Sequence, residues 1–580
     1  MSDSRATPES ELRRGVLGAV AMAGIVPLLG GCDWIKGLFN PKPAPKSLAP
    51  ASAVVDLHCH SFNIRDMPAY AFLVDVVVEN PALRPVAAPF ARLLVEVCRA
   101  PAKTAEDEKA VLTAILANPS GPRPAVITIA DITAMLATGI DGYLKRYSSL
   151  NGLLNPLAPS TIDADQMILT LFDAFLPGVV DKGKSVAQNG PAIAMATPQL
   201  IAKLTTAPAA QGVPFNQYAA QFLTKWAPEI AKYRFQIADD AGAIFNGVTP
   251  VFLAPATLDI TNWLPEAKQD EPPTPLPLQA EVMKLMSLIQ PANQALHGFI
   301  GFDPWRQVVD EQSGTHPTAL EIVQAAIESQ GFVGVKVYPP MGFQAIGNAS
   351  LPDSEFATLL PATITGRGAR IDAALMKLYD YCNSNEVPIL AHCAASQGPS
   401  PQAAARAHPQ HWKTLLDANP ALKGTLRVCL GHFGGLWNFD GGSATCWTPD
   451  VAALLQSGQY PFLYTDLGDF SNILNRDPSD KTTLILQNVK QLLDANPKVR
   501  ERIMYGTDFH LLGREPSYEK YYTQTIAQML PALGTPNLDG FMHANAARFL
   551  GLEPGRKTRM RLEKFYVDNA QSPAKLAQFA

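Results

Sequence analysis

Eight short apolar runs rich in β-branched residues, most of them followed by a segment of helical periodicity, constrain this 580-residue chain more than any other feature. Such a series predicts parallel strands joined by helices, and eight is the number of strands that closes a parallel barrel. The expected strands are Ala53–Cys59, Val248–Leu258, Leu296–Asp303, Gly331–Tyr338, Val387–Cys393, Thr425–His432, Pro461–Leu467 and Arg502–Asp508. The expected helices between them include Leu278–Ile289, Thr318–Gln330, Ile371–Asn385 and Lys481–Ala495.

The expected fold class is therefore α/β, as a TIM-like (β/α)8 barrel built from residues 53–60 and 248–580, with a large insertion at 61–247 after the first strand. The insertion is far too long for a single crossover, and its apolar runs, broken by Pro/Gly loops, predict a mostly helical segment. Those runs are Phe90–Val97, Met167–Phe175 and Tyr218–Ile230. Because βα loops build the active-site face of such barrels, we expect the insertion to roof or wall the site. The alternative is a separate helical domain with its own partner.

Composition excludes several classes of protein. Hydrophobic residues make up 47% of the chain and charged residues 17%, a balance that excludes a disordered polymer, a collagen and a multi-span membrane protein. The net charge is −5, and there is no block of Lys and Arg long enough to bind nucleic acid, so we expect no nucleic-acid partner.

The N-terminus has the layout of an export signal. Arg13 and Arg14 precede an uncharged, Gly- and Ala-rich run that ends at Gly31 and is broken by Pro27, too short and too weakly apolar for the roughly 20 residues of a bilayer span. The paired arginines partly resemble a twin-arginine signal, although Gly and Val follow them. We expect residues 1–31 to be a signal peptide.

The signal ends in Leu-Gly-Gly-Cys, which resembles the lipobox of bacterial lipoproteins and makes Cys32 the expected lipidated residue. Residues 32–52, rich in Pro, Ala and Lys, then predict an extended tether that holds the body off a membrane. The expected location is the cell envelope, on the periplasmic side of a bacterial membrane. An ordinary cleaved signal and a coincidental apolar helix with a buried cysteine are the alternatives.

The first predicted strand ends in Asp56-Leu-His58-Cys-His60. Residues i, i+2 and i+4 of a strand share one face, so the two imidazoles point the same way and can chelate one divalent metal ion. By itself a His-x-His pattern is weak evidence, and ordinary polar residues at a strand end are the alternative.

Three other predicted strands carry a metal-binding side chain at the carboxyl end, namely His392, His432 and Asp508. Zinc and similar ions bind neutral imidazole nitrogen and carboxylate oxygen. His58, His60, His392 and Asp508 therefore form a candidate ligand set. Three cysteines at odd offsets from these residues are expected on the outer face, where they would only pack: Cys59, Cys393 and Cys429.

These motifs, in this order, resemble the amidohydrolase superfamily of metal-dependent barrel enzymes, in particular the branch that opens with a D-x-H-x-H strand and includes decarboxylases as well as hydrolases. The resemblance covers residues 53–59 and 248–552, where His543–Leu552 resembles the closing helix of the family. It implies a metal bound by His58, His60, His392 and Asp508, with Asp508 also accepting a proton from the attacking water. His432 would bind a second metal or polarise the substrate.

Lys336, on the fourth predicted strand, leaves the number of metal ions open. In binuclear relatives a carboxylated lysine bridges two metals, whereas mononuclear relatives keep a lysine for structure or for a substrate anion. A lysine held by a neighbouring carboxylate is the plain alternative. We favour one ion, because the following Tyr338-Pro-Pro-Met-Gly resembles the mononuclear branch. Zinc is the expected metal, and Mn, Fe and Co fit the same ligands.

Candidate substrate-binding residues follow the strand ends. Arg65 could hold a carboxylate through a bidentate contact, and its alternative role is to brace a loop. Tyr338 could line the pocket, as could Phe433, Trp437 and His510, each with a structural role as the alternative. Asp466 and Asp469 are assigned no role.

The leading hypothesis is a metal-dependent hydrolase that cleaves a C–N or C–O bond of a small-molecule substrate. A metal-dependent decarboxylase of an aromatic or unsaturated carboxylic acid is the first alternative. A non-catalytic cell-envelope binding lipoprotein is the second.

Overall fold

The computed structural model describes the body of the chain but not its N-terminus. The described residues are 53–77, 91–92, 95, 98–99, 101–125, 178–181, 183–184, 188, 192, 229–245, 247–269, 272–474, 481–515 and 517–579. The predicted signal peptide, Cys32 and the tether at 32–52 lie outside these residues, as does Met167–Phe175 and most of the two other apolar runs of the insertion.

Each of the eight predicted strands contains an observed strand, and all the strand pairs in the described residues are parallel. The strands are β1 (Val55–Cys59), β2 (Phe252–Pro255), β3 (Ala295–Leu296), β4 (Phe299–Gly301), β5 (Gly334–Val337), β6 (Ile389–His392), β7 (Val428–Gly431), β8 (Leu463–Asp466) and β9 (Ile503–Met504). Every residue in them is buried, as expected for parallel strands covered on both faces.

One predicted strand, Leu296–Asp303, is divided into β3 and β4 by His297 and Gly298. At Gly298 an added Cβ would lie 2.7 Å from the carbonyl oxygen of Pro255, so only glycine allows the two backbones to approach this closely. Beyond this point the strand still pairs with the residues that follow β2, through a parallel bridge between Ala256 and Phe299, and its other edge pairs with β5.

The strands form two sheets, ordered β1-β2-β3 and β4-β5-β6-β7-β8-β9. Backbone hydrogen bonds join the sheets on both sides. The N–H of Thr257, after β2, donates to the carbonyl of Phe299 (3.0 Å), and the N–H of Leu57 donates to the carbonyl of Tyr505 (3.2 Å) after β9. The predicted α/β class with parallel strands is thus confirmed, and the closed barrel stays a prediction.

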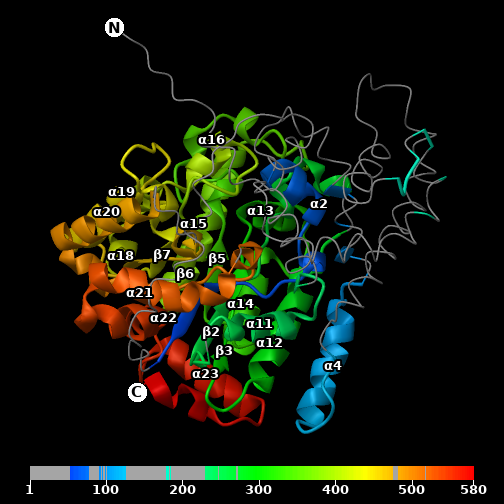
Figure 1. Ribbon diagram of the computed structural model, residues 1–580. Helices are drawn as coiled ribbons and strands as arrows, with labels where there is room; N and C mark the ends of the chain where they lie inside the picture. Colours follow the sequence, from blue (N-terminus) through cyan, green and yellow to red (C-terminus); the bar gives the residue numbers. More distant parts are fainter. Residues whose placement is uncertain are drawn as a thin grey trace.

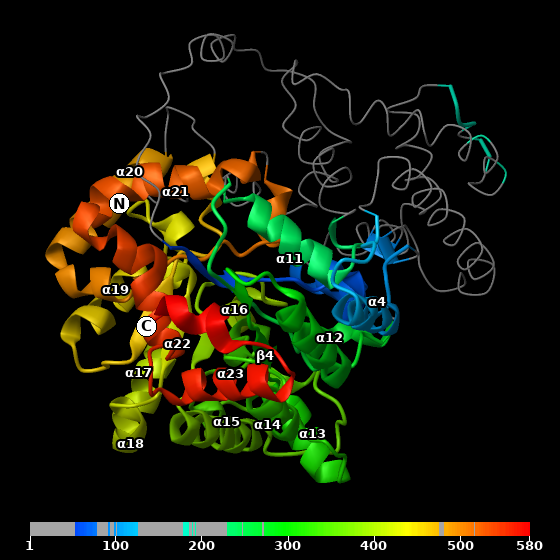
Figure 2. The same ribbon diagram turned by 90° about the horizontal axis from the view of Figure 1, so that it is seen from below.

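Helices surround the strands (Figures 1 and 2). Each of the four helices predicted from periodicity corresponds to an observed one: α12 (Leu276–Ile289), α14 (Ala319–Ser329), α15 (Arg367–Asn385) and α20 (Lys481–Ala495). The start of α14 has a local cause, because the Thr318 side chain caps the N–H of Glu321 while the Glu321 carboxylate accepts from the N–H of Thr318.

Two C-terminal helices, α22 (Asn545–Leu550) and α23 (Lys557–Asp568), lie at one end of the molecule. In Figure 1 the helices that follow strand carboxyl ends, α2 (Ala69–Ala71) after β1 and α16 (Pro401–Ala404) after β6, lie at the opposite end from α23. Phe549, Phe565 and Tyr566 pack into a buried apolar cluster with Phe252 and Phe299 from the strands. The C-terminal helices therefore cover the end of the strands opposite the candidate site.

The described parts of the insertion include α4 (Ala105–Ala117) and α11 (Arg234–Ala243). Buried Arg234 joins them to the loop after β1, because its guanidinium pairs with the carboxylates of Asp66 and Glu108. The remainder of residues 61–247 lies outside the described residues, so the helical insertion as a whole stays a prediction. Nowhere in the described part of the chain is a helix both long enough and apolar enough to cross a bilayer.

Candidate metal centre

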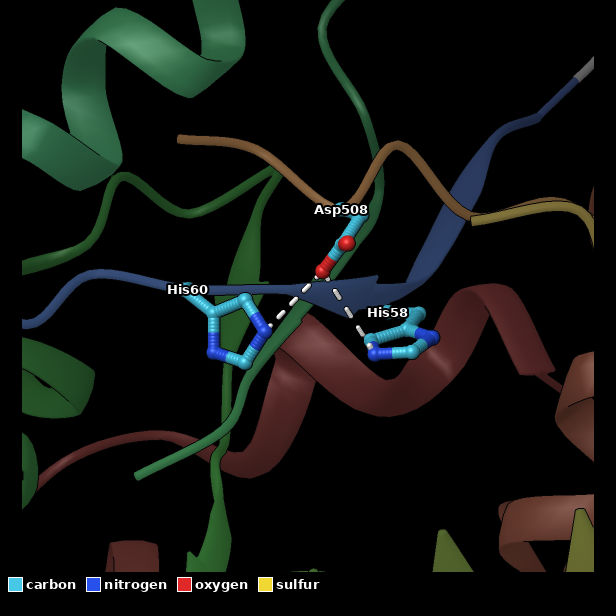
Figure 3. Close-up of side chains that lie close together, drawn as sticks. All are labelled: His58, His60 and Asp508. Carbon is cyan, nitrogen blue, oxygen red and sulfur yellow. Dashed lines mark ion pairs between the residues drawn. The ribbon is translucent and has the colours of Figure 1, made fainter. Parts of the chain in front are cut away.

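Three predicted metal ligands meet at the carboxyl end of β1. Asp508 Oδ1 lies 3.0 Å from His60 Nε2 and 3.6 Å from His58 Nε2. Figure 3 shows the carboxylate of Asp508 beside both imidazoles, which project from the blue strand and the residue after it. The three side chains are buried, and their ligand atoms lie within 4.8 Å of one another. The two-residue period of the strand thus brings His58 and His60 to one face, as expected.

In both imidazoles, the contact made by Nδ1 shows which ring nitrogen carries the proton. His60 Nδ1 lies 2.9 Å from the carbonyl oxygen of Ala256, and His58 Nδ1 lies 3.1 Å from Asp466 Oδ2. Because carbonyl and carboxylate oxygens only accept hydrogen bonds, each Nδ1 carries the proton in the neutral ring. Both Nε2 atoms then present a lone pair toward the position between the rings, which is how metal-binding histidines are oriented in proteins.

Asp466 belongs to the candidate site, although sequence reasoning assigned it no role. Its carboxylate is fully buried and accepts from His58 Nδ1, from the N–H of His432 (3.0 Å) and from the N–H of Gly468 (2.8 Å). Asp466 is the last residue of β8, so the strand-end position that identified the other ligands also marked this one. It orients His58 and the loop that carries His432.

The prediction that Cys429 faces outward is wrong. Its Sγ lies 3.3 Å from Asp466 Oδ2, the oxygen that also contacts His58. The prediction assumed that Cys429 and His432 lie in one extended strand and therefore point to opposite faces. In the structure β7 ends at Gly431, and the φ angle of His432 is 64°, so His432 is not part of the strand. Side chains alternate only where the backbone is extended.

His432 and His392 form a second part of the site. His432 Nδ1 lies 2.9 Å from the carbonyl oxygen of Gly468, and its Nε2 lies 3.1 Å from His392 Nδ1. His432 also belongs, with His58 and Asp466, to a second group whose ligand atoms lie within 4.8 Å of one another. Neither group includes His392. Its contact with the site is through the ring of His432, and its place in a ligand set with His58, His60 and Asp508 stays a prediction.

Lys336 on β5 lies beside the first group. Its Nζ is buried and 2.9 Å from His58 Nε2, so the amine donates to the lone pair of that nitrogen. Burial lowers the pKa of Lys336 to about 8, although the carboxylates of Asp508 and Asp466 act in the opposite direction. The lysine therefore lies beside the candidate ligand atoms, and its part in metal binding stays a prediction.

The charges of the site suit a cation. Burial, together with Lys336, lowers the pKa of His58 to about 4, so at pH 7 its imidazole is in the neutral form that binds metals. Burial acts to raise the pKa of Asp508, whereas the neighbouring imidazoles, when protonated, act to lower it, and the balance holds that pKa below its ordinary value. Asp508 is thus a carboxylate beside both imidazoles.

These residues fit a divalent metal ion. Asp508 Oδ1 is buried and makes no hydrogen bond to any described residue, although it lies 3.0 Å from His60 Nε2. With neutral imidazoles, two electron-pair donors face one another and neither supplies a proton, an arrangement that a cation between them would stabilise. Two imidazole nitrogens and a carboxylate oxygen are also the ligands that zinc and similar ions prefer.

The candidate substrate residues have different surroundings. Arg65 donates from Nε to the carbonyl of Ala102 (2.9 Å) and from Nη2 to the carbonyl of Arg99 (2.8 Å), contacts that brace the loop after β1. The ring of Tyr338 lies 4.7 Å from that of His392. The role of Arg65 and Tyr338 in substrate binding stays a prediction.

Of the other predicted pocket residues, Trp437 has its ring 5.6 Å from that of His432, whereas His510 Nε2 lies 3.1 Å from the carbonyl oxygen of Phe62. Phe433 is fully buried next to His432. Among these contacts, that of Trp437 reaches a histidine of the candidate site, and the part of all three side chains in substrate binding stays a prediction.

Comparison with known proteins finds a family match over part of the chain. Residues 302–552 match a family model described as amidohydrolase. The matched range includes Lys336, His392, His432 and Asp508, whereas β1 lies before it. No curated protein matches the chain.

Among solved structures, the chain is similar to an amidohydrolase from Burkholderia multivorans with bound HEPES, at 14% identity over 54% of this chain and 88% of that one (TM-score 0.32). A second crystal form of that amidohydrolase, with bound zinc, matches at 13% identity over 54% and 87% (TM-score 0.32). A protein described as a metal-dependent hydrolase, from Lactobacillus casei, matches at 11% identity over 86% and 96% (TM-score 0.33).

The role of Asp466 can be tested with Asp466→Asn. An amide NH₂ facing His58 Nδ1 would move the imidazole proton to Nε2, where it blocks the metal-binding lone pair, so we expect the metal affinity to fall by about 10- to 100-fold. The measurement is a competition titration against a chromophoric chelator. Asp494→Asn, at an aspartate whose side chain is 52% exposed, is the matched control. Unchanged affinity in Asp466→Asn would exclude the orienting role.

Proposed function

The chain belongs to the amidohydrolase superfamily, and we propose that it is a metal-dependent hydrolase that cleaves a C–N or C–O bond of a small molecule. The observation that carries this proposal is the approach of His58 Nε2 and His60 Nε2 to the buried Asp508 Oδ1, which makes no hydrogen bond to a described residue. Such an arrangement is costly in a folded protein unless a cation compensates it.

Each residue of the site has a separate role in the proposed reaction. His58, His60 and Asp508 would hold the ion, and Asp466 and Ala256 orient the two imidazoles. A divalent ion, when bound, polarises a carbonyl group and lowers the pKa of a water molecule. Asp508 would accept a proton from the attacking water, and His432, whose Nδ1 is held at 2.9 Å by the Gly468 carbonyl, would polarise the substrate or bind a second ion.

We propose one ion, with zinc as the metal, and Mn, Fe and Co as ions that the same ligands accept. Lys336 Nζ lies 2.9 Å from His58 Nε2, where an amine can serve the substrate or, after carboxylation, a second ion. His392 would join the ligands after a small rearrangement, since its ring lies 4.4 Å from that of His432.

We also propose that the two sheets close into one eight-stranded barrel and that the insertion at 61–247 walls the site. The hydrogen bonds between the sheets on both sides support the closure. The ion pairs of Arg234 support the second proposal, because Asp66 lies six residues after His60, in the loop that leaves the metal centre.

A substrate screen tests the proposed reaction. The metal-loaded protein would be assayed against amides, esters and lactones, and in parallel against aromatic and unsaturated carboxylic acids. We expect hydrolysis in the first set, and a loss of about 10²- to 10⁴-fold in kcat/KM for Asp508→Asn, because the proton acceptor is removed. Asp494→Asn serves again as the control with wild-type activity.

Two results would contradict the proposal. Release of carbon dioxide from an acid, with no hydrolysis in the first set, would identify a decarboxylase. A fully metal-loaded protein that turned over neither set but bound one of the compounds would support a non-catalytic binding lipoprotein.

We further propose that the chain is exported and anchored through a lipid on Cys32, on the periplasmic side of a bacterial membrane. The support is the lipobox-like sequence that ends at Cys32 and the tether of residues 32–52 after it. In cells fed a labelled fatty acid, we expect the wild type to carry the label in the membrane fraction and Cys32→Ala to carry none. A mature protein that retained residues 1–31, or equal labelling of Cys32→Ala, would contradict the anchor.

A further inference from the structure

Asp508 has an unusual backbone conformation for a metal-binding residue that is not glycine. Its φ angle is 54°, in the left-handed region, and it lies four residues beyond the end of β9. Side chains with a Cβ atom rarely adopt this conformation unless neighbouring contacts enforce it, although aspartate tolerates it better than most. The contacts that hold Asp508 therefore determine where its carboxylate points.

The residues on either side of Asp508 are fixed by one side chain of β1. The carboxylate of Asp56 accepts twice from Thr507, at 3.0 Å from the backbone N–H to Oδ1 and at 2.7 Å from the hydroxyl to Oδ2. The Thr507 hydroxyl in turn accepts from the N–H of Phe509 at 3.0 Å. Asp56 and Thr507 are fully buried, so water does not compete for these bonds.

The same strand supplies the other ligands. Asp56 lies two residues before His58 on β1, and the carbonyl of His58 accepts from the N–H of Asp508 at 2.6 Å. One strand thus carries both imidazoles and also the two groups that hold the backbone of the third ligand. The relative positions of the three ligands are set within this unit.

We infer that Asp56 and Thr507 are positioning residues, which hold Asp508 in the left-handed conformation that directs its Oδ1 toward both Nε2 atoms. This inference rests on the proposed metal-dependent function and adds to it a role for two residues that touch neither the ion nor the substrate. The plain alternative is that the bonds only tie β1 to the segment after β9, in which case their loss would lower stability and leave the metal affinity unchanged.

The test compares Thr507→Val, which keeps the shape of the side chain and removes the hydroxyl, with Thr507→Ser, which keeps the hydroxyl. Thr448→Val is the matched control, because Thr448 is also fully buried and its hydroxyl donates to the carbonyl of Phe433 at 2.7 Å. The readouts are zinc affinity by chelator competition, the visible spectrum of the cobalt-substituted protein, and the thermal unfolding midpoint of the metal-free protein.

We expect Thr507→Val to lower the zinc affinity by about 10- to 100-fold and to shift the cobalt spectrum, since loss of a group that supports a ligand has effects of this size. Thr507→Ser should restore both properties, and Thr448→Val should change neither. In a background of Asp56→Ala, the further change to Val at position 507 should lower the affinity less than it does in the wild type, because the bond to Asp56 is already lost and only the bond from the N–H of Phe509 remains to be removed.

The outcomes separate this inference from the proposed function. Wild-type affinity and spectrum in Thr507→Val, with a lowered unfolding midpoint, would overturn the positioning role and leave the metal site intact. If Thr507→Val did not fold, Asp56→Ala with wild-type affinity would overturn it equally. A wild-type protein that bound neither zinc nor cobalt would overturn the proposed function, and this inference with it.

Discussion

Strand β1 lies between β2 and the segment that follows β9, and its position decides which side chains meet in the interior. The strand carries Asp56 and His58, and His60 directly follows it. Asp56 then fixes Thr507, while the carbonyl of His58 fixes the N–H of Asp508. The candidate metal centre depends on this pairing, because it brings His58 and His60 beside Asp508.

Burial of so many polar groups in one place has a physical cost that the structure largely offsets. Asp466 accepts from His58, His432 and Gly468, and the Ala256 carbonyl lies against His60 Nδ1. Buried charges and polar groups are stable when they are paired in this way. Among the candidate ligands, Asp508 Oδ1 is the buried atom left without a hydrogen bond to the described residues, and it faces imidazole lone pairs. A divalent cation bound at this position would compensate the unpaired oxygen.

Sequence reasoning predicted what depends on regular geometry. Strands, four helices and the convergence of His58, His60 and Asp508 follow from periodicity and from the fact that carboxyl ends of parallel strands share one side. It failed where the backbone leaves the extended conformation. The left-handed φ of His432 (64°) invalidated the offset used for Cys429, and close packing at Gly298 divided a strand that appeared continuous. Asp466 was overlooked because an aspartate before a loop has many ordinary uses, and only the contact with His58 reveals its role.

The most direct test of the account is the metal content per chain of protein purified without chelator, for the wild type, His58→Ala and Lys336→Ala. The account predicts one divalent ion in the wild type, lost from His58→Ala and kept in Lys336→Ala. About two ions, falling when Lys336 is replaced, would keep the site and correct the number of metals to a lysine-bridged pair. A wild type that held no divalent ion under any loading condition, or a His58→Ala variant that kept a full complement, would contradict the metal centre itself.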